Sequence, residues 1–227
     1  NILSQSLIEN LSREDSRNKY VEPQSFMWFQ SSSQDTVDQL EARIKQTYQR
    51  LLDYWDKTRF DLPNKSAEQF TSEWTMLVIK EIGFDLNKCK SPLKSDEKID
   101  FAISHRGWKG GGAPIIHIVS KDIGLGDRIP GSKYSPHDLV QQYLNQTKTE
   151  NWGVVTNGLE IRLIHDFYHQ TRKGYVSFNL EDLFDARLYK DFRVLYRLLH
   201  PSRFCKDKTG LCVLDNLFEE SKAAGVA

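Results

Sequence analysis

The sequence predicts an α/β or α+β fold, in which a mixed sheet is flanked by helices. Apolar residues recur at helical spacing in the first third of the chain, and short apolar runs typical of strands follow. Further on, strand-like and helix-like segments alternate, so that each can bury its apolar side against the other. We therefore expect helices, two strands, a helix, a hairpin, a further strand and a long helix, in that order.

Two helices are predicted in the first third. Asp35 or Thr36 can cap the first helix. In the second, Ser66 and Gln69 have the spacing of a capping box, and Gly83 can end the helix. The apolar stripe of the first helix is Val37, Leu40, Ile44, Tyr48, Leu51, Leu52 and Trp55. That of the second is Phe70, Trp74, Leu77 and Val78.

Two strands are predicted next, over 99–104 and 113–120, with a flexible glycine-rich loop at 107–112 between them. The second strand is an almost continuous apolar run, which is typical of an interior position in a sheet. From 123 to 134 the sequence has no apolar period. We expect a long loop there.

A capped helix and a hairpin follow. The Ser-Pro pair at 135–136 is typical of a helix start, because proline fits the first helical position. Strands are predicted over 152–156 and 159–165, joined by Asn157 and Gly158. Both residues tolerate positive φ, so the pair predicts a type I′ turn.

The last elements predicted are a strand over Tyr175 to Leu180 and one long helix over Leu183 to Leu199. We divide the chain into a helical N-terminal extension (1–60), an α/β core (61–204) and the start of a linker or helix (205–227). The chain begins without Met and stops within a charged, helix-favouring stretch. We expect it to be the N-terminal piece of a longer polypeptide.

Composition narrows the classes of function only slightly. The 31 basic residues balance the 31 acidic ones, so no global positive field indicates or excludes DNA binding. The odd set Cys89, Cys205 and Cys212 predicts free thiols in a reducing compartment, and the spacing of His200, Cys205 and Cys212 matches no common metal site. No signal peptide or membrane span is recognisable, so we expect a cytoplasmic protein without a membrane partner.

Asp100 and Lys121, at the two predicted strands, have the order that many metal-dependent DNA-cutting domains use. Such sites need oxygen ligands for Mg²⁺ at adjacent strand ends and a lysine nearby, and Glu73 on the preceding helix is a third candidate. However, Val119 stands where the second acid belongs. From spacing alone, an ordinary strand-end Asp and Lys is the simpler interpretation, and no metal site is predicted.

Four basic residues lie in the loops that flank the second strand: Arg106, Lys109, Arg128 and Lys133. They are candidates for a rim that contacts nucleic-acid phosphates. The alternative is a solvated charged surface.

Two segments resemble a known family. The segment 135–164, SPHDLVQQYLNQTKTENWGVVTNGLEIRLI, resembles the N-terminal region of large adenine-specific DNA methyltransferases of the type IIG restriction-modification kind, including those of phage-defence systems such as BREX and DISARM. A helix ending in Tyr-Leu-Asn precedes a Trp-Gly to Thr-Asn-Gly strand in those proteins. The segment 185–204, DARLYKDFRVLYRLLHPSRF, resembles a later helix, and the similarity covers roughly 66–220.

The resemblance implies a PD-(D/E)XK nuclease-like fold ahead of a methyltransferase domain. Asp100 then matches the first acid and Lys121 the lysine, while Val119 replaces the family's glutamate. The implied partners are DNA and defence-system proteins. S-adenosylmethionine (SAM) would bind the parent protein, whereas this piece lacks the methylase motifs and needs no cofactor, except Mg²⁺ if it cleaves.

The leading hypothesis is a catalytically degenerate, nuclease-like N-terminal domain of a bacterial DNA methyltransferase, which contacts DNA or serves assembly. One alternative is an active Mg²⁺-dependent endonuclease that uses Glu73, Asp100 and Lys121. The other is a protein-interaction domain that does not bind DNA.

Overall fold

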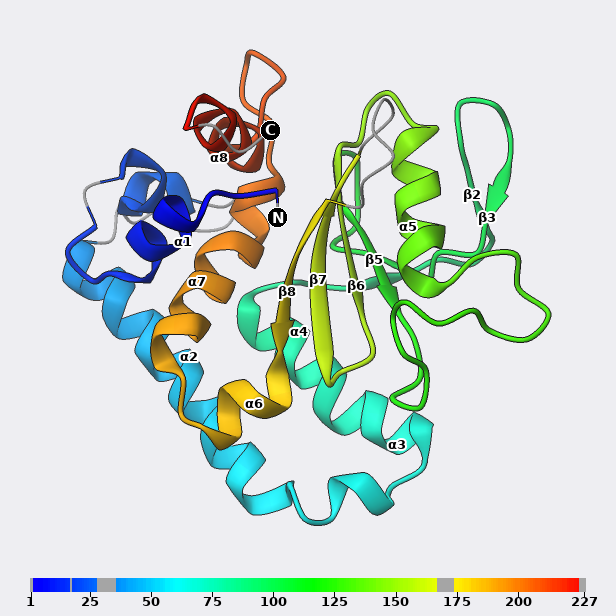
Figure 1. Cartoon of the computed structure of the whole chain (residues 1–227), viewed down its shortest axis with the longest axis horizontal. Coiled ribbons are helices and arrows are strands. Elements are labelled where there is room, and N and C mark those ends of the chain that lie inside the picture. The colour runs from blue at the N-terminus through cyan, green and yellow to red at the C-terminus, as the bar shows by residue number, and fades with distance from the viewer. Residues whose placement is uncertain (1, 17, 28–35, 167–173, 225–227) are drawn as a thin grey trace.

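The computed structural model describes residues 2–16, 18–27, 36–166 and 174–224, and they form an α+β fold (Figure 1). A six-stranded, mostly antiparallel sheet has the order β1-β4-β5-β6-β7-β8, and β2 and β3 form a separate pair. The strands are β1 (Asn87–Lys88), β2 (Leu93–Lys94), β3 (Asp100–Phe101), β4 (His105–Arg106), β5 (Ile115–Ile118), β6 (Trp152–Thr156), β7 (Glu160–His165) and β8 (Tyr175–Asn179).

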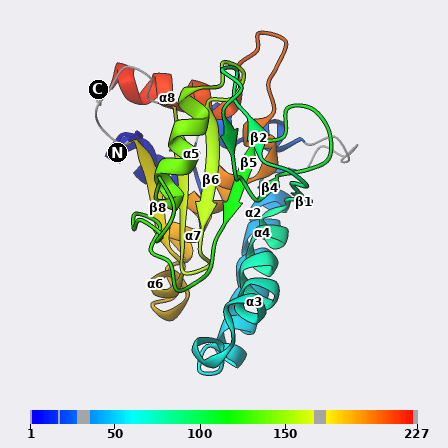
Figure 2. The same ribbon diagram turned by 90° about the vertical axis from the view of Figure 1, so that its right-hand side faces the viewer.

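Helices cover both faces of the six-stranded sheet (Figures 1 and 2). The α-helices are α1 (Gln5–Ser12), α2 (Val37–Thr58), α3 (Ala67–Phe70), α4 (Met76–Ile82), α5 (Pro136–Asn145), α6 (Leu180–Asp185), α7 (Tyr189–Leu199) and α8 (Val213–Ala223). A π-helical segment (Thr71–Thr75) joins α3 to α4, and short 3-10 turns occupy Lys19–Val21, Pro23–Phe26, Leu62–Asn64 and Pro201–Phe204.

Two apolar clusters fill the two sides of the sheet. On one side α5 packs on Ile115, Val155 and Ile164, and we call this the α5-side cluster. On the other, Ile116 and Val154 face a larger cluster that includes residues of α2, α4 and α7. Successive strand residues point to opposite faces, which explains how neighbours such as Ile115 and Ile116 serve different clusters.

The predicted helix starts are found where the caps were expected. Thr36 and Gln39 form a capping box at α2, and Ser66 and Gln69 form one at α3. Ser135 accepts a hydrogen bond from the Asp138 N–H at the start of α5. Asp35, the alternative cap, lies outside the described residues. Gly83 ends α4 with φ of 120°, a conformation that side chains rarely adopt.

The strand expected over 99–104 is wrong. Asp100–Phe101 forms β3, which pairs with β2, and the chain then bends, with the Ile103 N–H donating to the Phe101 carbonyl at 2.8 Å. Only His105–Arg106, as β4, joins the sheet beside β5. The Ser104 hydroxyl fixes the bend, because it donates to the Ile116 carbonyl (3.1 Å) and accepts from the Ile118 N–H (2.8 Å).

The predicted hairpin is present, but its turn is not type I′. β6 and β7 pair antiparallel, whereas α5 connects β5 to a parallel β6. Of the turn residues only Gly158 has positive φ, at 83°, and a type I′ turn requires two. The Asn157 side chain holds the turn instead, accepting the N–H groups of Leu159 and Glu160. A Cβ on Gly158 would lie 2.2 Å from the Thr75 hydroxyl.

The single helix expected over 183–199 is two helices. Arg187, between α6 and α7, has φ of 58°, which no α-helix accommodates. Its guanidinium donates to the Phe184 carbonyl at 2.7 Å and forms an ion pair with Asp56 of α2. These contacts stabilise a break that apolar spacing does not reveal.

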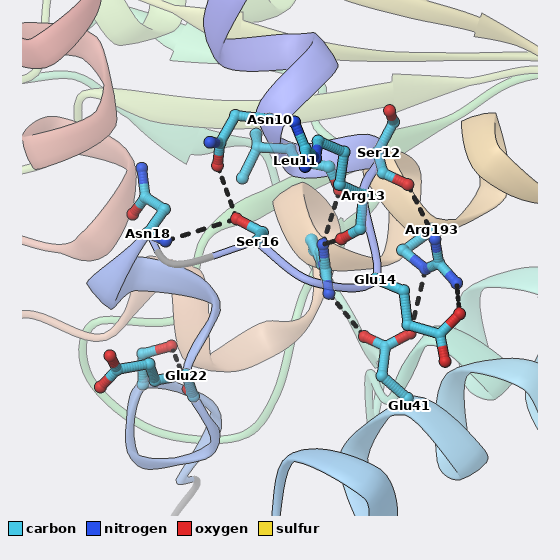
Figure 3. Close-up of polar contacts among 12 residues, drawn as sticks. Asn10, Leu11, Ser12, Arg13, Glu14, Ser16, Asn18, Glu22, Glu41 and Arg193 are labelled. Carbon is cyan, nitrogen blue, oxygen red and sulfur yellow. Dashed lines mark hydrogen bonds and ion pairs between the residues drawn. The ribbon is translucent and has the colours of Figure 1, made fainter.

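The N-terminal segment packs on α7 through buried charges. Arg193 forms an ion pair with Glu41 of α2 at 3.0 Å and donates to the Ser12 carbonyl at 2.8 Å (Figure 3). Arg197 also pairs with Glu41 and donates to the Leu11 carbonyl at 2.8 Å. The larger apolar cluster correspondingly contains residues from all three predicted divisions of the chain. Among the described residues, no helix is both long and apolar enough to cross a membrane.

Candidate functional site

The end of β5 is where the sequence placed a nuclease-like site. The Val119 N–H donates to the Thr156 carbonyl at 3.0 Å, which continues the pairing of β5 with β6. The Val119 side chain packs against the α5-side cluster. The position that the resemblance assigns to a metal-binding glutamate is therefore occupied by a half-buried apolar side chain.

The three candidate catalytic residues have separate surroundings. Asp100 is exposed on β3 and lies opposite Lys94 of β2. Glu73, on the π-helical segment, forms an ion pair with Lys65. The Lys121 ammonium donates to the Pro63 carbonyl at 2.6 Å, close to the start of α3.

Asp100 lies on a different element from the other two candidates, whereas Lys121 reaches α3, directly before the segment that carries Glu73. Figure 1 shows the β2–β3 pair at the upper right and α3 at the lower right. Lys121 lies 5.5 Å from the centre of the Phe70 ring of α3. The structure thus brings Lys121 to α3 but leaves Asp100 on a different element. Within the described ranges, no group of three or more His, Cys, Asp or Glu residues could hold a metal ion.

A neutral histidine pair lies beside Ser104, between β4 and β5. Burial is the main cause that lowers the pKa of His117 to about 4, and the charge of His105 adds to it. Burial also lowers the pKa of His105. The His117 ring accepts a hydrogen bond from the Ser104 N–H at 3.3 Å, and the His105 ring forms a hydrogen bond with the Ser104 hydroxyl at 2.9 Å. The Ser104 hydroxyl also donates to the Ile116 carbonyl. Ser104, His105 and His117 therefore join β4 to β5, and the hydroxyl is not activated as a nucleophile.

Arg106 is engaged inside the protein. It forms an ion pair with Glu150 and donates to the Tyr143 hydroxyl (2.8 Å) and the Ala113 carbonyl (2.9 Å). Burial and the nearby Glu150 charge raise the pKa of Tyr143 to about 12, so the phenol stays protonated. A guanidinium held in this way is not presented on an open rim with Lys109.

The other three basic candidates are exposed, at two different places. Lys109 lies in the β4–β5 loop, ahead of β5, whereas Arg128 and Lys133 lie in the loop that follows it. Residues 119–134 contain no helix or strand, as expected for the second loop. Arg128 and Lys133 therefore follow β5 in the chain, as Lys121 does, whereas Lys109 precedes it.

Two anchors hold this second loop in place, and sequence reasoning missed both. Leu125 is buried in the α5-side cluster, and its carbonyl accepts the His137 N–H at 2.9 Å. The Asn157 amide donates to the Ile123 carbonyl at 3.0 Å. The signal for the first anchor is an apolar residue, Leu125, in a stretch without an apolar period. For the second anchor, the sequence signal of Asn157 indicates only a turn.

No family model, curated protein or solved structure matches the chain.

Proposed function

We propose that this chain is a DNA-contacting domain with the architecture of PD-(D/E)XK nucleases and without their cleavage chemistry. The observation that carries the proposal is the end of β5, where Lys121 follows the strand and the half-buried Val119 packs against an apolar cluster. Cleavage requires oxygen ligands for Mg²⁺ at that point. Val119 offers none, and Asp100 lies on the separate β2–β3 pair.

The anchored loop after β5 supports DNA contact. Leu125 and Asn157 fix the loop, and Arg128 and Lys133 extend from it into solvent. Lysine and arginine bind phosphates mainly through charge, which does not require a basic protein overall. Following the family resemblance, we place the domain in a bacterial, SAM-dependent DNA methyltransferase of a restriction-modification or phage-defence system.

A plasmid assay tests the loss of cleavage. Supercoiled plasmid incubated with the purified chain and Mg²⁺ or Mn²⁺ should stay intact. The variant Val119→Glu should not restore nicking, because Glu73 is paired with Lys65 and Asp100 lies on another element. Nicking by the unmodified chain that disappears in Asp100→Ala would establish an active endonuclease instead.

A titration with duplex DNA at two salt concentrations tests the contact. Binding should weaken as salt rises, because phosphate contacts release counterions. The double variant Arg128→Glu/Lys133→Glu should bind at least tenfold more weakly. A matched variant, Lys190→Glu/Lys208→Glu, reverses two exposed charges on α7 and ahead of α8 and should bind normally. If the unmodified chain does not bind at low salt, the protein-interaction hypothesis replaces this one.

A further inference from the structure

β8 is the last strand of the six-stranded sheet, and among the described residues β7 is its only neighbour in that sheet. Hydrogen-bonded residue pairs lie just beyond both ends of the strand. The Leu180 N–H donates to the Leu159 carbonyl at 2.8 Å, and the His165 N–H donates to the Gly174 carbonyl at 3.4 Å. Hydrogen-bonded and non-bonded pairs alternate in an antiparallel ladder. Every second residue of β8 therefore turns its backbone groups away from β7.

The register identifies the residues with outward backbone groups. Val176 and Phe178 lie in hydrogen-bonded pairs with β7, so Tyr175 and Ser177 direct their N–H and C=O groups to the free edge. No backbone hydrogen bond links these outward groups to another described residue. Such an edge is a template on which an extended peptide can add a further strand.

A cleft of about 380 Å³ runs along this edge. Its wall includes the four consecutive residues Val176–Asn179. Consecutive strand residues point to opposite faces, so a cleft that contacts all four lies at the edge of the strand. Figure 1 shows β8 at the side of the sheet nearest to α1 and α7. Apolar side chains from that direction, Leu3, Ile8 and Val194, form the facing wall.

The charge of the cleft has one sign. Asp182 of α6 and Asp191 of α7 line it, both exposed, and no Lys, Arg or His is among the described residues that do so. An apolar wall favours alternating apolar side chains, and the two carboxylates favour basic ones. We propose that the β8 edge binds an extended segment of a partner protein, in which apolar residues alternate with basic residues.

This docking is independent of DNA contact by the loop after β5. β8 is three strands away from β5 in the sheet, which corresponds to roughly 14 Å at the usual strand spacing. A partner at the β8 edge would therefore extend the sheet on the side away from β5, and each site can be tested while the other is intact.

A fluorescein-labelled peptide, Lys-Val-Lys-Val-Lys-Val-Lys, is a suitable probe for fluorescence anisotropy with the whole chain. We expect saturable binding and slower hydrogen exchange at the Tyr175 and Ser177 amides. The charge-reversed peptide Glu-Val-Glu-Val-Glu-Val-Glu should bind at least tenfold more weakly. Absence of binding by the basic peptide, or equal binding of both peptides, would overturn the proposal.

Variants at the β8 edge distinguish strand addition from nonspecific electrostatic binding. Ser177→Pro removes an outward N–H, a change that edge strands tolerate, and should abolish binding. Ser177→Ala keeps that N–H and should bind as the unmodified chain does. Asp191→Lys, at an exposed position, should weaken binding at least fivefold. Circular dichroism verifies folding. Equal affinities of the folded proline and alanine variants, or an unchanged affinity of Asp191→Lys, would contradict the proposed mode.

Discussion

The arginines of α7 and the basic residues after β5 have opposite surroundings. The side chains of Arg193 and Arg197 are 6% and 2% exposed, and both pair with Glu41. Arg128 and Lys133 are exposed on an anchored loop. A basic residue in the sequence therefore does not by itself indicate a binding surface. Buried partners make the first pair structural, whereas exposure leaves the second pair available to a ligand.

The largest loss of stability is expected when Glu41, the shared partner of Arg193 and Arg197, is removed. Glu41→Ala leaves Arg193 and Arg197 without their shared counterion, and losing one member of a buried charge group costs about 3–5 kcal/mol. Urea denaturation measures the free energy of unfolding. Glu14→Gln is the control, because Glu14 contacts the same Arg193 but is 75% exposed. Similar losses in both variants would contradict the structural role of the buried carboxylate.

Acid should lower the stability of the protein through two buried histidines, His117 on β5 and His200 directly after α7. The pKa of His117 is lowered from 6.5 to about 4 and that of His200 from 6.5 to about 3, mainly by burial. Between pH 6.5 and 4 the unfolded chain therefore binds more protons than the folded one, and stability falls as pH falls. Each histidine contributes a slope of about 1.4 kcal/mol per pH unit.

Denaturation across this pH range measures the slope, and His117→Asn should reduce it by the share of one histidine. If the slope is unchanged in that variant, His117 is not held neutral in the folded protein.

Arg106 tests whether a basic residue that was a candidate for the phosphate-contacting rim stabilises the fold instead. Arg106→Ala leaves Glu150 and Tyr143 without their common partner and should lower the free energy of unfolding by about 2 kcal/mol. Lys109→Ala, at an exposed position nearby, should change it by less than about 0.5 kcal/mol. Thermal or urea denaturation makes the comparison. A stable Arg106→Ala protein with weaker DNA binding would return Arg106 to the nucleic-acid interface.

The smallest effect on stability is expected in the loop after β5. Arg128→Ala and Lys133→Ala remove exposed side chains and should each change the free energy of unfolding by less than about 0.5 kcal/mol. Their effect should appear in DNA affinity. Loss of stability without loss of affinity would indicate that these side chains serve the loop itself.

The local parts of the fold could be predicted from the sequence. Caps such as Thr36 and Ser66 act on the next few residues, and Gly83 supplies a conformation that other residues avoid. The α+β class followed from the alternation of apolar patterns. These features depend on short stretches of chain, so spacing alone could reveal them.

The errors concern contacts between distant segments. The break at Arg187 depends on Asp56, and the bend before β4 depends on bonds from Ser104 to β5. The sequence position of Arg106 predicts a rim residue, whereas its ion pair with Glu150, 44 residues further on, engages it inside the protein. The α+β fold with helices on both faces is present, whereas the assignment to the nuclease family and the roles of Glu73, Asp100 and Lys121 stay predictions.

The turn at Gly158 also affects the order of folding events. The hairpin of β6 and β7 is local in sequence and can close quickly. Its turn is then held by the Trp74 indole, which donates to the Gly158 carbonyl at 2.8 Å across 84 residues of chain. Closing so long a loop costs entropy, so we expect this contact to form after the hairpin. The fluorescence of Trp74 should therefore report the late docking of a preformed hairpin onto the helix.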